Sequence, residues 1–193
     1  VSRSGLARCM KRHGVNTRPV EDKDAPVVRK TFKDYAPGFI HMDIKYLPQM
    51  ADETARRYLF VAIDRATRWV FMRIYADQSE VSSTDFLRRL KAGAPMNIEK
   101  LLTDNGSQFT DRFTSKAKQP SGKHAFDREC VLLGIEHRLI KPRHPQTNGM
   151  VERFNGRISD VLATTRFQSR EDLQTTLERY EKLYNNHLPP RAL

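Results

Sequence analysis

The strongest constraint on the fold comes from three strand-like segments that follow one another between residues 39 and 75. In FIHMDIKYL (residues 39–47) apolar and polar side chains alternate, which is the pattern of a strand with one buried face. RYLFVAID (57–64) and RWVFMRIY (68–75) are rich in aromatic and β-branched residues, and a short polar stretch separates them. The pair therefore predicts an antiparallel hairpin that turns at residues 64–67.

The segments that follow define the order of the remaining elements. Residues 79–94 predict a helix, with Ser79 as a possible N-cap and Gly93 near its end. The other expected elements are a strand at 97–104, a helix at 123–134, a strand at 135–140, and helices at 147–167 and 169–187. This is the order of an α/β, ribonuclease-H-like fold, with a five-stranded mixed sheet flanked by helices.

The first 34 residues differ in character from this core. Residues 1–18 combine apolar side chains at loosely helical spacing with several arginines. They predict either a remnant of a helix-turn-helix DNA-binding region or a solvated basic tail. Residues 19–34 contain prolines and mixed charges and are interpreted as a linker, so the core is expected to span residues 35–193. Because the chain begins at Val1, without a methionine, we interpret it as a piece of a longer protein.

The charge balance points to a polyanionic partner. The 193 residues carry a formal net charge of +11. A positive field of this size favours nucleic acid, although charge by itself does not separate DNA from RNA or from an anionic membrane. A basic protein without such a partner is the alternative. The two cysteines, Cys9 and Cys130, lie far apart, so the sequence predicts neither a disulfide framework nor a cysteine-rich zinc site and suits the cytoplasm.

Three acidic residues stand out by their place in these elements. Asp43 lies mid-strand, where an unpaired carboxylate is costly to bury. Asp104 ends the fourth strand and precedes Asn-Gly, a pair that on its own indicates an ordinary turn. Glu152 begins a helix on a face of small and polar residues, where its charge could simply stabilise the helix N-terminus. Together, two aspartates and a glutamate could supply an oxygen-rich site for Mg²⁺ or Mn²⁺.

The segments around these acids resemble one known family. HMDIKYL, LLTDNGSQFT, HPQTNGMVERFNG and YNNHLPPRAL resemble, in their order and spacing, the integrase catalytic core of bacterial insertion-sequence transposases, within the retroviral integrase superfamily. The resemblance covers residues 35–193. It implies a ribonuclease-H-like fold and an Asp-Asp-Glu triad, here Asp43, Asp104 and Glu152, that is both catalytic and metal-binding. The implied cofactor is Mg²⁺ or Mn²⁺, with two ions expected when DNA is bound.

The same resemblance implies metal-dependent DNA cleavage and strand transfer during transposition, in the bacterial cytoplasm and in contact with the nucleoid. The partners would be the element ends, the target DNA and further copies of this chain. Two other functions stay open: a ribonuclease-H-like nuclease without strand transfer, and a non-catalytic DNA-binding regulator of transposition. Seven residues flanking Glu152 are candidates for DNA contacts, each with a solvated surface position as the alternative: Lys141, Arg143, His144, Gln146, Asn148, Arg153 and Arg157.

Two departures from the family pattern bear on these expectations. Between Asp104 and Glu152 lie 47 residues, 105–151, which is more than retroviral integrases usually have. We assign the excess to the polar segment TDRFTSKAKQPSGKHA. The N-terminal region holds only His13 and Cys9 as candidate zinc ligands. A His/Cys zinc module is therefore not expected, which favours the transposase branch of the superfamily.

Overall fold

The computed structural model describes residues 3–14, 35–49, 53–114, 118–140, 149–167 and 169–187. Two compact units divide the chain, Val1–Lys33 and Asp34–Leu193, and each is described by itself. The smaller unit contains α1 (Arg3–Arg12), whose Leu6 and Met10 side chains are exposed. The helix-turn-helix remnant stays a prediction, and the predicted linker at 19–34 lies outside the described residues. None of the described helices is long and apolar enough to cross a membrane.

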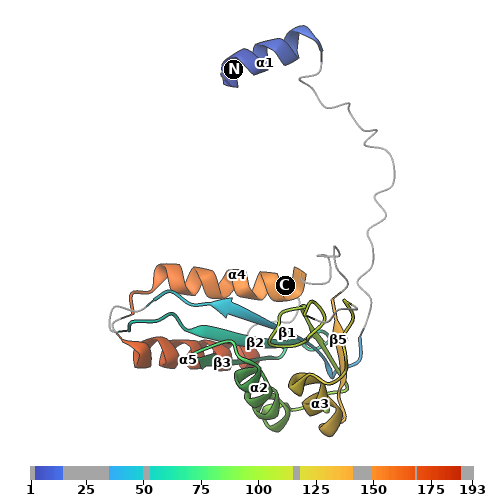
Figure 1. Ribbon diagram of the computed structural model, residues 1–193. Helices are drawn as coiled ribbons and strands as arrows, with labels where there is room; N and C mark the ends of the chain where they lie inside the picture. Colours follow the sequence, from blue (N-terminus) through green and yellow to red (C-terminus); the bar gives the residue numbers. More distant parts are fainter. Residues whose placement is uncertain are drawn as a thin grey trace. The chain divides into compact units, whose positions relative to one another are not determined.

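The larger unit is built on a five-stranded mixed sheet with the order β3-β2-β1-β4-β5 (Figure 1). The first three strands, β1 (Phe39–Tyr46), β2 (Tyr58–Asp64) and β3 (Val70–Tyr75), form the predicted antiparallel arrangement. β4 (Lys100–Thr103) pairs with β1 in parallel, and β5 (Glu136–Leu139) pairs with β4 in parallel. Because the chain returns to β1 after β3, β1 becomes the central strand of the sheet.

The turn between β2 and β3 is organised by the buried carboxylate of Asp64. Its Oδ2 accepts hydrogen bonds from the N–H groups of Ala66 (3.1 Å) and Thr67 (2.7 Å). Its Oδ1 accepts the N–H of Gly38, just before β1, at 2.9 Å. One side chain therefore closes the hairpin and anchors the start of the central strand, which gives Asp64 a structural role.

β4 is shorter than the sequence pattern predicts, because it begins at Lys100 and not at residue 97. Before β4 the chain crosses Gly38, whose φ is +102° and where an added Cβ would lie 2.2 Å from the carbonyl oxygen of Asn97. The N–H groups of Glu99 and Lys100 both donate to the Gly38 carbonyl, at 3.0 and 3.1 Å. Only after this crossing is the backbone placed to pair with β1.

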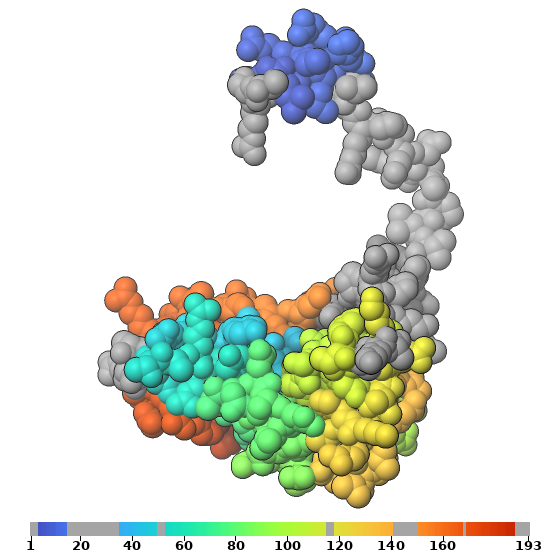
Figure 2. Space-filling view, in the orientation of Figure 1, coloured from blue at the N-terminus to red at the C-terminus, as the bar shows by residue number. Residues whose placement is uncertain are grey.

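Helices cover both faces of the sheet in three layers (Figure 1). α2 (Glu80–Gly93) and α3 (Ala125–Leu132) pack on one face, and α4 (Gly149–Thr164) and α5 (Arg170–His187) pack on the other. Ser79 caps α2 as predicted, since its hydroxyl accepts the N–H of Ser82 at 3.2 Å. α2 and α3 adjoin at the surface, where Figure 2 shows them in green and yellow.

The alternation along β1 divides its residues between the two faces. Ile40 and Met42 are fully buried in the core under α2 and α3. Asp43 and Lys45 lie on the opposite face, where both hydrogen-bond to side chains of α4. The polar face of the central strand is therefore placed directly beneath α4.

Candidate functional site

Asp43 lies in the middle of the central strand and is half-buried beneath α4. Burial raises the pKa of its carboxyl, and the negative charges of Asp104 and Glu152 raise it further. Hydrogen bonds from the Ile44 backbone and from the Asn155 side chain act in the opposite direction but do not cancel the rise. The negative charge of Asp43 is thus only partly compensated by its surroundings.

Asp104 directly follows β4 and begins a tight turn. Its Oδ1 accepts the N–H of Gly106 at 2.8 Å, so the carboxylate closes the turn on its own backbone. Among the described glycines, Gly106 is not one of those with a positive φ. A Cβ at this position would lie 2.4 Å from the side-chain nitrogen of Gln108. The glycine in this Asn-Gly pair therefore provides room for Gln108, and the turn does not depend on a left-handed backbone.

Asn105 and Arg112 of the polar insertion tie this turn to its surroundings. Asn105 donates from Nδ2 to the carbonyl of Ile140, just after β5, at 2.8 Å, and accepts a hydrogen bond from Arg112 at 3.2 Å. Further along, the Asp111 carboxylate accepts the N–H of Ser121 at 2.9 Å. Asn105 therefore holds the Asp104 turn against the end of β5, and Arg112 of the polar insertion supports Asn105.

Glu152 lies in the first turn of α4, and its side chain is exposed. The opposite face of α4 buries Val151, Phe154 and Ile158 in the core that α5 shares, which fixes the rotation of the helix. Asn155, three residues after Glu152, then reaches β1 and donates from Nδ2 to Oδ2 of Asp43 at 2.8 Å. The sequence pattern placed Asn155 on the same polar face as Glu152, but it gave no indication that Asp43 would be its partner.

The oxygen atoms around Asp43 suit a divalent cation in their chemistry. Within the described residues, Oδ1 of Asn155 is buried and accepts no hydrogen bond. Carboxylate and amide oxygens are the ligands that Mg²⁺ and Mn²⁺ prefer. The three acids do not converge on one metal position, however: the described residues contain no group of three His, Cys, Asp or Glu side chains placed to hold a metal ion. Mutual repulsion of uncompensated carboxylates favours such an open arrangement.

Two of the seven predicted DNA-contact residues lie in the described part of the chain. Arg153 is exposed on α4. Arg157 is half-buried and interacts with Tyr180 of α5: burial raises the pKa of that phenol, and the charge and hydrogen bond of Arg157 oppose the rise. Arg157 therefore helps to join α4 to α5. The other five candidates lie outside the described residues: Lys141, Arg143, His144, Gln146 and Asn148.

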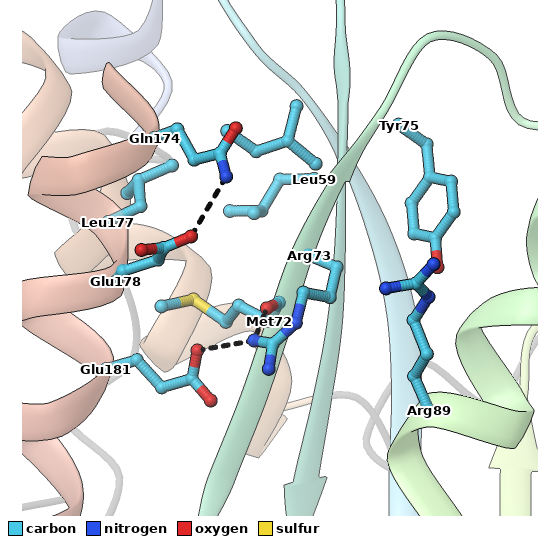
Figure 3. A pocket seen from close by; sticks show the side chains of 10 residues that line it. Leu59, Met72, Arg73, Tyr75, Arg89, Gln174, Leu177, Glu178 and Glu181 are labelled. Atoms are coloured by element: carbon cyan, nitrogen blue, oxygen red, sulfur yellow. Dashed lines mark hydrogen bonds and ion pairs between the residues drawn. The ribbon is translucent and has the colours of Figure 1, made fainter. Parts of the chain in front are cut away.

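A cavity of about 190 Å³ between β3 and α5 is separate from these acids (Figure 3). Its lining combines apolar side chains with Arg73 and Glu181, whose charged groups form an ion pair at 3.1 Å. Asp43, Asp104 and Glu152 are not among its lining residues. Because these opposite charges already pair, we attribute the cavity to the packing of α5 on the sheet.

Comparison with known proteins gives family matches along the whole larger unit. One integrase core domain model matches residues 34–145, and a second integrase core domain model matches residues 133–193. "Putative integrase ORF3" of Spiroplasma virus SpV1-C74 is 27% identical over 154 residues, which cover 77% of this chain and 42% of the relative. An uncharacterized protein of Caenorhabditis elegans is 30% identical over 99 residues, which cover 50% of this chain and 7% of the relative. The chain thus spans less than half the length of these relatives.

Solved structures bear out the predicted fold. The catalytic core domain of BIV integrase matches with a TM-score of 0.56 at 17% identity, covering 79% of this chain and 86% of that chain. A chain from the simian T-cell lymphotropic virus intasome in complex with PP2A regulatory subunit B56 gamma also matches with a TM-score of 0.56, at 19% identity, covering 79% of this chain and 50% of that chain. At these identities the likeness shows the ribonuclease-H-like fold. Since a family model matches more than half of its residues, the chain belongs to the integrase core domain family, in the retroviral integrase superfamily.

Proposed function

We propose that this protein carries out metal-dependent DNA cleavage and strand transfer as a transposase of the Asp-Asp-Glu type. The observation that supports this most directly is the environment of Asp43. Its carboxyl is half-buried on the central strand, its pKa is raised by burial and by the charges of Asp104 and Glu152, and Asn155 donates a hydrogen bond to it. Acids that repel one another are unfavourable unless positive charge compensates them, and a bound divalent cation would supply that charge.

In this proposal Asp43, Asp104 and Glu152 hold the divalent ions, two of them when DNA is bound. Such ions, when bound, offset the charge of the carboxylates and activate water or a DNA 3′-hydroxyl for in-line attack on phosphorus. Asn155 orients the Asp43 carboxylate through its 2.8 Å hydrogen bond. The exposed Glu152 side chain leaves this face of α4 open to a large substrate. The reaction then needs no protein nucleophile.

DNA is the proposed partner, and the net charge of +11 supports it. Contacts from basic residues to phosphates make the affinity depend strongly on salt. Strand transfer must hold an element end and a target DNA together, and one structural relative was solved in an intasome. We therefore include a homo-oligomer in the proposal. A bacterial insertion-sequence origin and a cytoplasmic, nucleoid-associated location are also part of it, on the basis of motifs such as HPQTNGMVERFNG.

A branched DNA that mimics the joined product separates strand transfer from hydrolysis. Strand transfer exchanges one phosphodiester bond for another, so the reaction can run in reverse on this substrate and reseal the target strand. We expect the chain to produce the resealed strand when Mn²⁺ is added. A nuclease without transfer activity would release only hydrolysed strands. A non-catalytic regulator would bind the DNA and leave every strand unchanged, with authentic element ends as well as with the branched DNA.

A pair of matched variants tests the role of the third acid. Glu152→Gln is expected to abolish resealing while DNA binding stays near the wild-type level or becomes slightly tighter, because the metal-site acids repel phosphates when no ion is bound. Glu171→Gln changes another exposed glutamate in the first turn of a helix, and it should leave both properties unchanged. A loss of ~1.4 kcal/mol of transition-state stabilisation corresponds to about tenfold in rate. Resealing by Glu152→Gln at the wild-type rate would remove Glu152 from the catalytic set.

A further inference from the structure

A series of hydrogen-bonded polar side chains connects α3 to the peptide of Asp104. Asp127 of α3 accepts from Nδ1 of His137 on β5 at 2.5 Å. Nε2 of the same ring lies 2.8 Å from the hydroxyl of Thr103, the last residue of β4. That hydroxyl in turn lies 3.0 Å from the carbonyl oxygen of Asp104, to which it can donate. Four groups from three elements thus form one continuous series that ends at a proposed catalytic residue.

These groups are removed from solvent, so their hydrogen bonds matter energetically. Thr103 is fully buried, and the side chains of His137 and Asp127 are only 6% and 17% exposed. The His137 ring also packs edge-on against Phe126, with the ring centroids 5.1 Å apart. A buried polar group that loses its partner costs about 1–3 kcal/mol. The ring is therefore held in one orientation, with Nε2 directed at Thr103.

The hydrogen-bonding inventory makes the Thr103 hydroxyl the link between the ring and Asp104. The hydroxyl carries one proton and can accept further hydrogen bonds. When it donates to the Asp104 carbonyl, it accepts from Nε2–H of His137, while Nδ1–H donates to the Asp127 carboxylate. This arrangement requires a proton on both ring nitrogens, that is, an imidazolium paired with the Asp127 carboxylate. A valine at position 103 would keep nearly the same shape but could make neither bond. The direction of the hydroxyl proton thus depends on His137 and Asp127, and so does the hydrogen bond to the Asp104 carbonyl.

We propose that Thr103, His137 and Asp127 are positioning residues that fix the Asp104 carboxylate by holding its peptide at the end of β4. Among the described residues, the carboxylate itself accepts only a local hydrogen bond, from the N–H of Gly106 at 2.8 Å. Its position therefore depends on the anchors of the turn, which are Thr103 on one side and the bond from Asn105 to Ile140 on the other. Groups that orient a metal ligand from behind commonly change metal affinity about 10–100-fold when removed. The inference rests on the proposed function in one respect, the role of Asp104 as a metal ligand.

Thr103→Val and Thr103→Ser form the test, because the first keeps the shape and the second keeps the hydroxyl. The first measurement is amide hydrogen exchange at Gly106 by NMR, without metal, and the second is the Kd for Mn²⁺ by calorimetry. Thr103→Val is expected to accelerate Gly106 exchange and to weaken Mn²⁺ binding about tenfold. Thr103→Ser should stay close to wild type in both. His137→Gln, which cannot bridge the same two partners, should resemble Thr103→Val.

Cys130→Ala controls for stability, since Cys130 is buried in α3 beside the series but belongs to the apolar core. It should lower the unfolding temperature without a selective change at Gly106. The inference is overturned if Thr103→Val leaves Gly106 exchange at the wild-type rate, or if Thr103→Ser is impaired as much as Thr103→Val. If Gly106 responds as expected but wild type binds no Mn²⁺, the positioning series stands and the proposed function fails.

Discussion

Replacing Asn185 with alanine removes the side chain that pairs with the outer edge of the sheet. β3 is an edge strand, and its first residue, Val70, is fully buried. The N–H of Val70 donates to Oδ1 of Asn185 at 2.9 Å, and Nδ2 of Asn185 donates to the carbonyl of Val70 at 2.8 Å. One amide near the end of α5 thus satisfies both backbone groups of the edge residue, as a neighbouring strand would.

The expected loss follows from these two bonds. Each hydrogen bond contributes about 1 kcal/mol net, and a buried group left unpaired costs about 1–3 kcal/mol. Since water can reach part of an edge strand after truncation, we expect Asn185→Ala to lower the free energy of unfolding by about 2–4 kcal/mol. For a unit of this size that corresponds to a fall in Tm of roughly 5–12 °C. Asn185→Asp keeps the acceptor and loses the donor, so its effect should be intermediate.

Urea unfolding followed by tryptophan fluorescence suits this prediction, because the one tryptophan, Trp69, precedes Val70. Asn186→Ala is the matched control: Asn186 is exposed, and its truncation should change the free energy of unfolding by no more than about 0.5 kcal/mol. If the urea unfolding curves of Asn185→Ala and Asn186→Ala have the same midpoint and the same slope, the Asn185 amide does not contribute to stability in the way its geometry indicates.

Three further predictions concern the central strand and α4. Asp43→Asn should raise the Tm at pH 7 without metal, because the pKa of Asp43 is raised by burial and by like charges, and it should remove the stabilisation that Mn²⁺ gives wild type in a thermal melt. Burial and the charge of Arg65 lower the pKa of His41 to about 4, so its contribution to stability is complete above pH 6.5 and is lost as the pH falls towards 4. At pH 5 the loss is about 2 kcal/mol, and the difference between wild type and His41→Gln in a pH series of urea melts should show it. Gly38→Ala should cost at least about 2 kcal/mol, since φ is +102° and the Cβ would meet the Asn97 carbonyl, whereas Gly156→Ala on open α4 should gain about 0.5–1 kcal/mol; equal melting temperatures of the two variants would contradict this account.

Local sequence patterns determined the elements of this protein and their order. The alternation from Phe39 to Tyr46 predicted which face of β1 would be apolar, because side chains on a strand alternate with a period of two. Ser79 predicted the start of α2 for a similar reason, since the capping bond joins residues three positions apart. The family motifs identified Asp43, Asp104 and Glu152 as the candidate acids, and that assignment stays a prediction until it is tested by mutation.

The tertiary structure decided which distant residues meet, and no local pattern carried this information. Asn155 reaches Asp43 across 112 residues because the buried stripe of α4 sets the rotation of the helix over β1. Thr103 and His137 meet as diagonal neighbours on one face because β4 and β5 pair in parallel, with Thr103 opposite Leu139. A shift of the register by one residue would turn each side chain to the other face. Periodicity and capping act within a few residues and can be read along the chain. Register and helix docking depend on packing of the whole sheet, and so they exist only in the folded protein.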